Sequence, residues 1–139
     1  GRYELGADEA LIIEVKVPKQ VRYWGIDLHD DLNMVVDWMN RQSCLNGHTS
    51  TPDADGVVRY VVSAQDPGVP NWLDNAGYEK GMICARWQRC DTYPEHTTTK
   101  VKLADIRKHL PADTPIVSAE QRDAAIRLRR KGLQMRRRW

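Results

Sequence analysis

The strongest structural signal in the sequence is the segment Val57–Ala64 (VVRYVVSA), which is rich in β-branched residues and directly follows the turn sequence Asp53–Gly56 (DADG). In such a turn the Asp side chain bonds back to the backbone, and the glycine accepts a positive φ. β-Branched side chains favour an extended backbone. The pattern therefore predicts a β-strand with a well-defined start.

Three more segments have the composition of β-strands. They are Ala10–Val17, Tyr23–Leu28 and Gly81–Gln88. Pro18 closes the first of them, because proline cannot donate a hydrogen bond to a neighbouring strand. From Val57 to Gln88 the order of strand, proline-rich loop, turn and strand is typical of a hairpin. Residues 30–50 have a mixed periodicity, so helix and strand both stay open there.

The signals change to helical ones towards the end of the chain. In Val101–Leu110 the apolar residues recur at roughly helical spacing, and Pro111 then ends the pattern. Ser118 and Gln121 have the spacing of a capping box, which predicts that a terminal helix begins at Ser118.

Length and composition fit a single soluble domain. A chain of 139 residues can close one hydrophobic core. We expect a β-sandwich body over residues 1–95 and a helical extension over residues 96–139 that packs on it or projects from it. Hydrophobic residues at 41% and charged residues at 29% are ordinary for a soluble protein, and no apolar run is long enough to cross a membrane.

The chain start and the cysteines bear on its cellular context. Gly1 stands where an initiator Met would be, and no secretory signal follows, so we expect a fragment or a subunit of a larger protein. Cys44, Cys84 and Cys90 are an odd number with no Cys-x-x-Cys pair, which argues against a disulfide framework and a structural zinc site. This usage indicates a reducing compartment, and we expect a cytoplasmic protein.

The charge is unevenly distributed. From Ser118 to Trp139 there are eight Lys or Arg residues and two acids, whereas the preceding part holds thirteen bases and seventeen acids. A basic terminus is one feature of nucleic-acid binding, but aromatic residues are missing from this one until Trp139. A solvated helix face or a helix that docks on a partner is therefore favoured over nucleic-acid binding.

The most distinctive stretch is DPGVPNWLD, which spans Asp66 to Asp74. Its prolines stiffen the loop, so that two carboxylates, the amide of Asn71 and the indole of Trp72 could hold fixed directions around a ligand. A structural alternative is equally open: Asp66 would cap the turn, Trp72 would fill the edge of the core, and Asn71 would satisfy loop carbonyls.

Two further residues are candidates for ligand binding. His48, in the polar segment 40–50, has the chemistry of an acid-base group or a metal ligand, and His29 with the two acids that follow it could add ligands if the fold brought them close. Since no metal-binding spacing is present, we predict neither a metal site nor a cofactor. Arg86 could meet Asp66 or Asp74 in an ion pair, or bind an anion.

The residues between Tyr23 and Trp87 resemble the bacterial domain-of-unknown-function family DUF1214. The segments that carry the resemblance are 40–42, 45–48, 53–56, 59–62, 66–74 and 86–87. It implies a carboxyl-terminal β-sandwich of the jelly-roll type within a larger protein, and it implies no catalytic residues.

The expected fold class is thus mainly β: an antiparallel, jelly-roll-like sandwich with a short helix and a basic C-terminal helix. We expect a noncatalytic module that forms part of a ligand pocket or a subunit interface with an amino-terminal domain or a second chain, and hence an oligomer. The alternative is an enzyme domain, a lyase or hydrolase acting on a hydrophobic ring compound or a carbohydrate. It would use His48, Asp66 or Asp74 for proton transfer and Trp72 as a platform.

Overall fold

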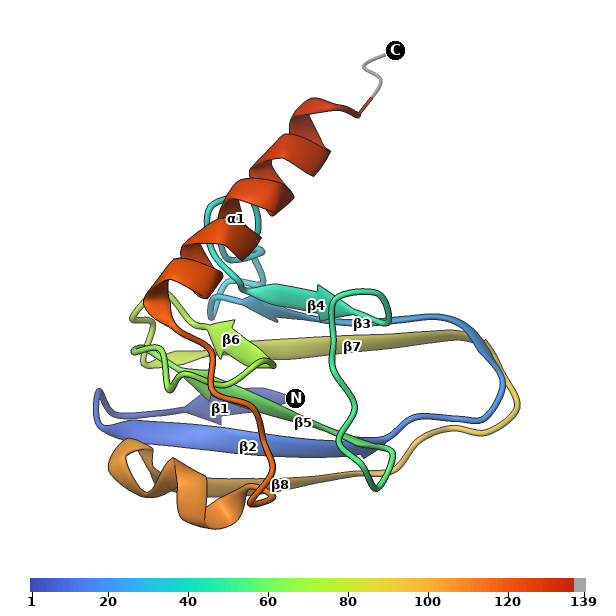
Figure 1. Ribbon diagram of the computed structural model, residues 1–139, viewed down its shortest axis with the longest axis horizontal. Coiled ribbons are helices and arrows are strands. Elements are labelled where there is room, and N and C mark those ends of the chain that lie inside the picture. The colour runs from blue at the N-terminus through green and yellow to red at the C-terminus, as the bar shows by residue number, and fades with distance from the viewer. Residues whose placement is uncertain (137–139) are drawn as a thin grey trace.

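The computed structural model describes residues 1–136, so that the last two arginines and Trp139 of the predicted basic tail lie outside the described residues. Figure 1 shows a two-layered β structure with a helix projecting from it. The strands and helices are β1 (Arg2–Glu4), β2 (Glu9–Lys16), β3 (Val21–His29), β4 (Cys44–Asn46), β5 (Val57–Ser63), β6 (Trp72–Asp74), β7 (Lys80–Cys90), β8 (His96–Lys102), the 3₁₀ helix η1 (Leu103–His109) and α1 (Ala119–Gln134).

The strands form two sheets of four. The first sheet has the order β1-β7-β3-β4, and the second has the order β6-β5-β2-β8. The pairing is antiparallel throughout, except that β6 lies parallel to β5. The mainly β fold and its sandwich of two sheets therefore agree with the sequence-based expectation.

The main hydrophobic core lies between the two sheets. Strand residues alternate between faces, so that Val58, Tyr60 and Val62 of β5 point inwards together with Ile26 and Leu28 of β3. All five are buried. Each large apolar side chain that is fully buried in this way contributes about 1.5–3 kcal/mol.

The second sheet is also covered on its outer face. Ile12 of β2 and Val61 of β5 pack there against Val69, Trp72 and Ile106, which come from the DPGVPNWLD loop and from η1. Burial on both faces explains why β5 reads as a nearly continuous apolar run and not as an alternating one.

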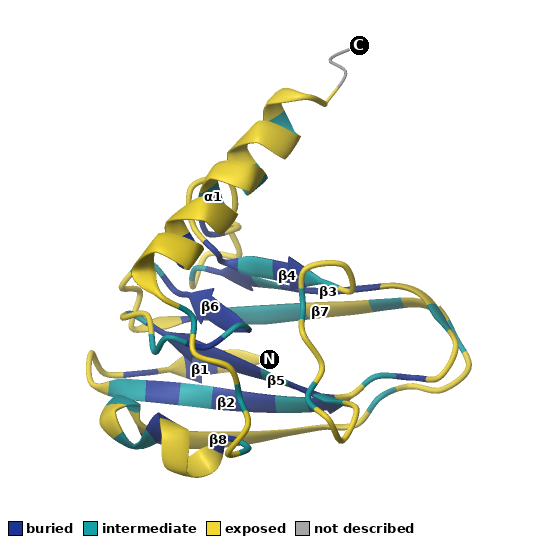
Figure 2. Ribbon diagram, viewed as in Figure 1, coloured by how far each residue is buried: buried dark blue, intermediate teal, exposed yellow. Residues whose placement is uncertain are grey.

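Helix α1 begins as predicted. The Ser118 side chain accepts a hydrogen bond from the Gln121 backbone N–H, and the Gln121 side chain accepts one from the Ser118 N–H, so the capping box is present. Most of the helix is exposed (Figure 2). The side chains that contact the sandwich include Arg122 and Arg129. No helix within residues 1–136 has the length and apolar composition needed to cross a membrane.

The predicted hairpin was wrong, and the structure settles a segment that the sequence left open. Strands β5 and β7 lie in different sheets, so the segment from Val57 to Gln88 is not a hairpin. The loop between them instead adds β6 to the edge of the second sheet. Between residues 30 and 50, where helix and strand stayed open, the chain is mostly irregular and contains only the short strand β4.

The boundary between the body and the helical extension also differs. Residues 96–102, which we had assigned to the extension, form β8 and pair with β2, so the β body reaches Lys102. Val101 is consequently a strand residue, and only Leu103–His109 are helical within the predicted helix. Pairing with β2 and burial of Val101 outweigh the helical spacing of the apolar residues.

Candidate functional site

The amide and the indole of the DPGVPNWLD loop are fully used in structural contacts. The Asn71 side chain accepts a hydrogen bond from the Thr51 N–H (2.8 Å) and donates one to the Thr51 carbonyl (2.7 Å). Trp72 is buried, and its indole Nε1 donates to the Ser63 carbonyl at 3.1 Å. These contacts correspond to the structural alternative for both residues.

The two carboxylates of the loop are ion-paired. Asp74 is buried and accepts a hydrogen bond from Arg41 at 2.9 Å. Asp66 accepts one from Arg122 of α1 at 2.8 Å, and the same guanidinium donates to the Val69 carbonyl at 2.6 Å. The Arg122 guanidinium also lies over the Trp72 ring, 5.2 Å from its centroid. The loop therefore serves as the docking site of α1.

The other two predicted residues lie elsewhere. His48 is exposed in the turn after β4, where its backbone N–H donates to the Asn46 side chain. Arg86 lies on the outer face of the first sheet and is ion-paired, but its partner is Asp27 and neither of the loop carboxylates. The six predicted residues thus do not converge on one cavity.

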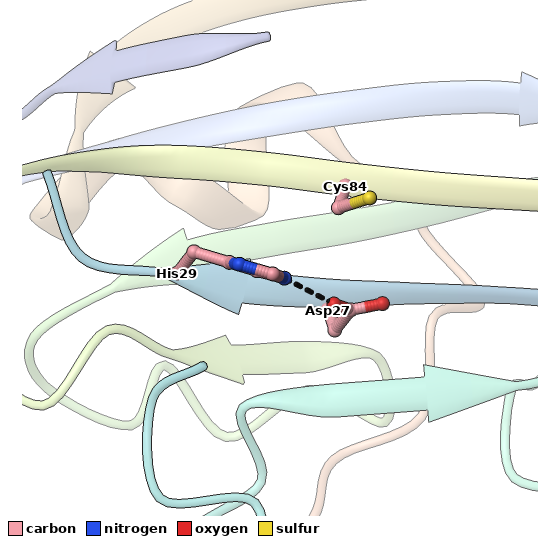
Figure 3. A group of neighbouring side chains, drawn as sticks. All are labelled: Asp27, His29 and Cys84. Atoms are coloured by element: carbon pink, nitrogen blue, oxygen red, sulfur yellow. Dashed lines mark hydrogen bonds and ion pairs between the residues drawn. The ribbon is translucent and has the colours of Figure 1, made fainter. Parts of the chain in front are cut away.

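A polar cluster that the sequence analysis did not identify lies beside Arg86. Asp27 and His29 are two residues apart in β3, so both side chains point to the same face of the first sheet. Cys84 lies directly opposite Asp27 on β7. The three residues each offer one ligand atom, and these atoms lie within 4.8 Å of one another. Figure 3 shows the carboxylate and the imidazole in contact, with the thiol on the adjacent strand.

The contacts of His29 involve both ring nitrogens. Its Nδ1 lies 3.1 Å from the Asn33 carbonyl, and its Nε2 contacts the Asp27 carboxylate. Burial by itself lowers the pKa of His29, but the hydrogen bonds to Asp27 and Asn33 outweigh burial and raise the pKa above its ordinary value.

The second oxygen of Asp27 binds Arg86. The guanidinium donates to Asp27 Oδ1 at 2.6 Å, and the charges of Asp27 and then Cys84 raise the pKa of Arg86. The sequence signal that would have found the cluster is the two-residue spacing of Asp27 and His29 within a strand. The sequence-based prediction joined His29 with the two acids that follow it. The first of these, Asp30, instead accepts a hydrogen bond from the Leu32 N–H.

A second candidate site is an apolar cleft inside the sandwich. It has a volume of about 530 Å³ and opens between β7 and β8. The cleft exists because β1 pairs only with Lys80–Met82 of β7, so the first sheet stops short and leaves the inner side of β8 uncovered. Its apolar lining includes Leu5, Leu11, Ile13, Val15, Ile26, Ile83, Ala85 and Trp87.

The cleft has polar features at its rim and in its wall. His96, Thr98 and Lys100 of β8 are exposed at the rim, on the side that faces the interior. Within the described part of the chain, the indole Nε1 of Trp87 is shielded from solvent and lacks a hydrogen-bond partner. An unpaired buried donor of this kind costs about 1–3 kcal/mol. The geometry therefore fits an apolar molecule, with polar and positively charged groups of β8 at the rim of the cleft.

Comparisons with known proteins identify the fold class and no activity. No protein-family model matches the chain, and no curated protein matches it significantly. The chain is similar to the crystal structure of an uncharacterised protein from Burkholderia cenocepacia, with a TM-score of 0.71, 39% identity, and coverage of 74% of this chain and 29% of that one. The VPA0106 protein of Vibrio parahaemolyticus shares the fold, with a TM-score of 0.52, 19% identity, and coverage of 71% and 30%.

The chain is thus a β-rich domain similar to part of bacterial proteins of unknown function, and it spans less than a third of the length of these two structures. The resemblance to DUF1214 stays a prediction.

Proposed function

We propose that this chain is the β-sandwich part of a larger bacterial protein and that its interior cleft binds an apolar small molecule with an anionic group. The observation that carries the proposal is the lining of the cleft. Ile13, Val15 and Ile26 form a buried apolar floor, and the exposed Ala85 at the mouth leaves the interior accessible. Pockets with mostly apolar walls and a few polar groups are typical of small-molecule sites.

The polar groups set the kind of ligand. Lys100 at the rim supplies positive charge, although its ammonium group also lies 3.3 Å from Glu9. A ring compound or an acyl chain with a carboxylate or sulfonate would place its apolar part on the floor and its anion at the rim. We favour this binding role over catalysis at Asp66 or Asp74, because both carboxylates are ion-paired with arginines.

The context of the domain is part of the same proposal. We place an amino-terminal domain or a second chain next to the cleft. This placement is supported by the two similar structures, each of which is more than three times as long as the part that matches this chain. Two packed sheets of four strands support a sandwich of the jelly-roll type, from which the parallel pairing of β6 with β5 is a departure. Three free cysteines support a cytoplasmic location.

The proposal is tested by titrating the chain with 1-anilinonaphthalene-8-sulfonate, a fluorescent ring compound that carries one sulfonate. Ala85→Trp should fill the mouth of the cleft and weaken binding at least tenfold, about 1.4 kcal/mol. Gln88→Trp is the matched control, because Gln88 is exposed on the opposite face of the same strand. Cooperative urea unfolding of each variant shows that the dye is not binding to a partly unfolded chain.

Two results would contradict the proposal. One is the absence of saturable binding by the wild-type chain. The other is equal affinity of the Ala85→Trp and Gln88→Trp variants, because the dye would then bind outside the cleft.

A further inference from the structure

The geometry of Asp27, His29 and Cys84 points to a metal site. We propose that these three side chains bind one divalent transition-metal ion of the zinc class and leave a fourth coordination position open. An imidazole nitrogen, a carboxylate oxygen and a thiolate sulfur are all established zinc ligands, and three protein ligands with one open position are typical of reactive zinc centres. No metal-ligand spacing along the chain indicates this site, because its ligands come from two strands that are distant in sequence.

The distances suit a single ion. Zinc lies about 2.0–2.3 Å from each ligand atom, so two ligands of one tetrahedral ion are roughly 3.3–3.8 Å apart. The ligand atoms of the three residues are all within 4.8 Å of one another. The Asp27 and Cys84 side chains would rotate to bring the three ligand atoms to bonding distance of one ion.

The surroundings orient two of the three ligands. The Asn33 carbonyl engages Nδ1 of His29, which directs Nε2 towards Asp27 and Cys84, and this arrangement is the usual second-shell support of a metal-bound histidine. Arg86 holds Oδ1 of Asp27 at 2.6 Å, so that Oδ2 is the oxygen that faces the imidazole. The ring of His29 is buried, with 8% of its side chain exposed, and therefore has little freedom to turn away.

The open position has room for a ligand from solution. Asp27 and Arg86 line a hollow of about 260 Å³ on the outer face of the first sheet, together with Tyr23, Val35 and Trp38. A water molecule or a small anion could approach the ion from this hollow. Arg86 would then stand beside the bound group and supply a positive charge.

Cys44 gives a natural control for the role of Cys84. It also lies in register with Asp27, on the other neighbouring strand. Its sulfur, however, accepts a hydrogen bond from Arg129 of α1 at 3.0 Å, and its carbonyl accepts a second one at 2.9 Å. Cys44 therefore anchors the helix, whereas Cys84 is the thiol of the proposed site.

The inference is independent of the proposed function. The metal ligands lie on the outer face of the first sheet, whereas the cleft lies on its inner face, so that either proposal can fail without the other. The test is a titration of the tag-free, reduced chain with Co²⁺, because a thiolate bound to Co²⁺ gives a charge-transfer absorption that a nitrogen or oxygen ligand does not give.

We expect one Co²⁺ per chain, the charge-transfer band, and displacement of the Co²⁺ by Zn²⁺. Cys84→Ser, a nearly isosteric change, should abolish the band and weaken binding at least tenfold, and Asp27→Asn should also weaken it at least tenfold. Cys44→Ser and Cys90→Ser should keep both the band and the affinity.

The proposal is overturned if the wild-type chain shows no band, or if the band survives in Cys84→Ser. It is also overturned if the band is lost in Cys90→Ser, since Cys90 lies at the far end of β7.

Discussion

Replacing Arg122 by alanine should release helix α1 from the sandwich. Apart from its start, the helix is held to the body largely by arginines, and Arg122 is the most buried of those that make such contacts. Its guanidinium makes two hydrogen bonds to Asp66, one to the Val69 carbonyl, and a cation–π contact with Trp72. Alanine removes all four interactions together.

The magnitude follows from the burial of each partner. Removing one member of a fully buried ion pair costs about 3–5 kcal/mol. The Asp66 carboxylate is 30% exposed, however, so water can replace part of what it loses. The Val69 carbonyl left unpaired adds about 1–3 kcal/mol, and the cation–π contact about 0.5–2 kcal/mol. Since these contributions overlap, we expect the free energy of unfolding to fall by about 3 kcal/mol.

The assay is urea unfolding followed by circular dichroism, with two comparison variants. Arg127→Ala breaks an exposed ion pair with Asp123 on the same helix and should cost less than about 0.5 kcal/mol. Arg122→Lys keeps the charge but loses the planar guanidinium that joins Asp66 to Val69. It should therefore lower the free energy of unfolding by more than half as much as Arg122→Ala does. Equal stability of the Arg122→Ala and Arg127→Ala variants would refute the reasoning, and so would full stability of Arg122→Lys.

Three further changes test separate parts of the fold. Gly81→Ala should lower the free energy of unfolding in urea by about 1–3 kcal/mol, because the added Cβ would lie 2.6 Å from the Tyr3 hydroxyl and would also meet the His29 carbonyl. In the control Gly132→Ala, the added Cβ in α1 meets no neighbouring atom, so this change should not destabilise the protein. Ser118→Ala removes the capping box and should cost about 1 kcal/mol, with no such loss for the exposed Ala119→Ser next to it. Hydrogen bonds, of which the one from the Asn40 backbone N–H has the largest effect, lower the pKa of Asp37 in the folded protein. The stability that Asp37 provides is therefore present above the pKa of the unfolded state, and it is lost as the pH falls through the lower pKa of the folded state. A carboxyl NMR titration that places the Asp37 pKa at or above about 3.9 would contradict this assignment.

The local parts of the fold were predictable from the sequence. The capping box at Ser118 depends on residues three apart, and the strand after Asp53–Gly56 depends on a turn and a run of β-branched residues. Both signals are complete within a few residues. The pairing of β5 with β2 and of β7 with β3 joins residues far apart in the chain, and no local signal distinguished this arrangement from a β5–β7 hairpin.

The candidate sites were harder to predict for the same reason. Asp27 and His29 share a face because of the strand period, but their proximity to Cys84 requires the register of β3 on β7, with 56 residues between Asp27 and Cys84. The cleft depends on the length of β1, a strand of only three residues. In contrast, the polar residues of DPGVPNWLD stood out in the sequence because the loop must satisfy many structural contacts at once.

Strand β7 connects the two proposed sites through a single physical constraint. Ala85 and Trp87 face the cleft, whereas Cys84 and Arg86 face outwards towards Asp27. Because side chains alternate along a strand, a slip of one residue against β3 would put Arg86 into the apolar interior and Trp87 onto the polar face. The ion pair between Arg86 and Asp27 opposes that slip from outside, and burial of the apolar residues opposes it from inside. Because Arg86 is about half exposed and the buried residues still oppose the slip in its absence, Arg86→Ala should leave dye binding in the cleft unchanged and weaken metal binding by freeing the Asp27 carboxylate. Ala85→Trp should affect the cleft alone, and titrations of both variants with the dye and with Co²⁺ check the two outcomes.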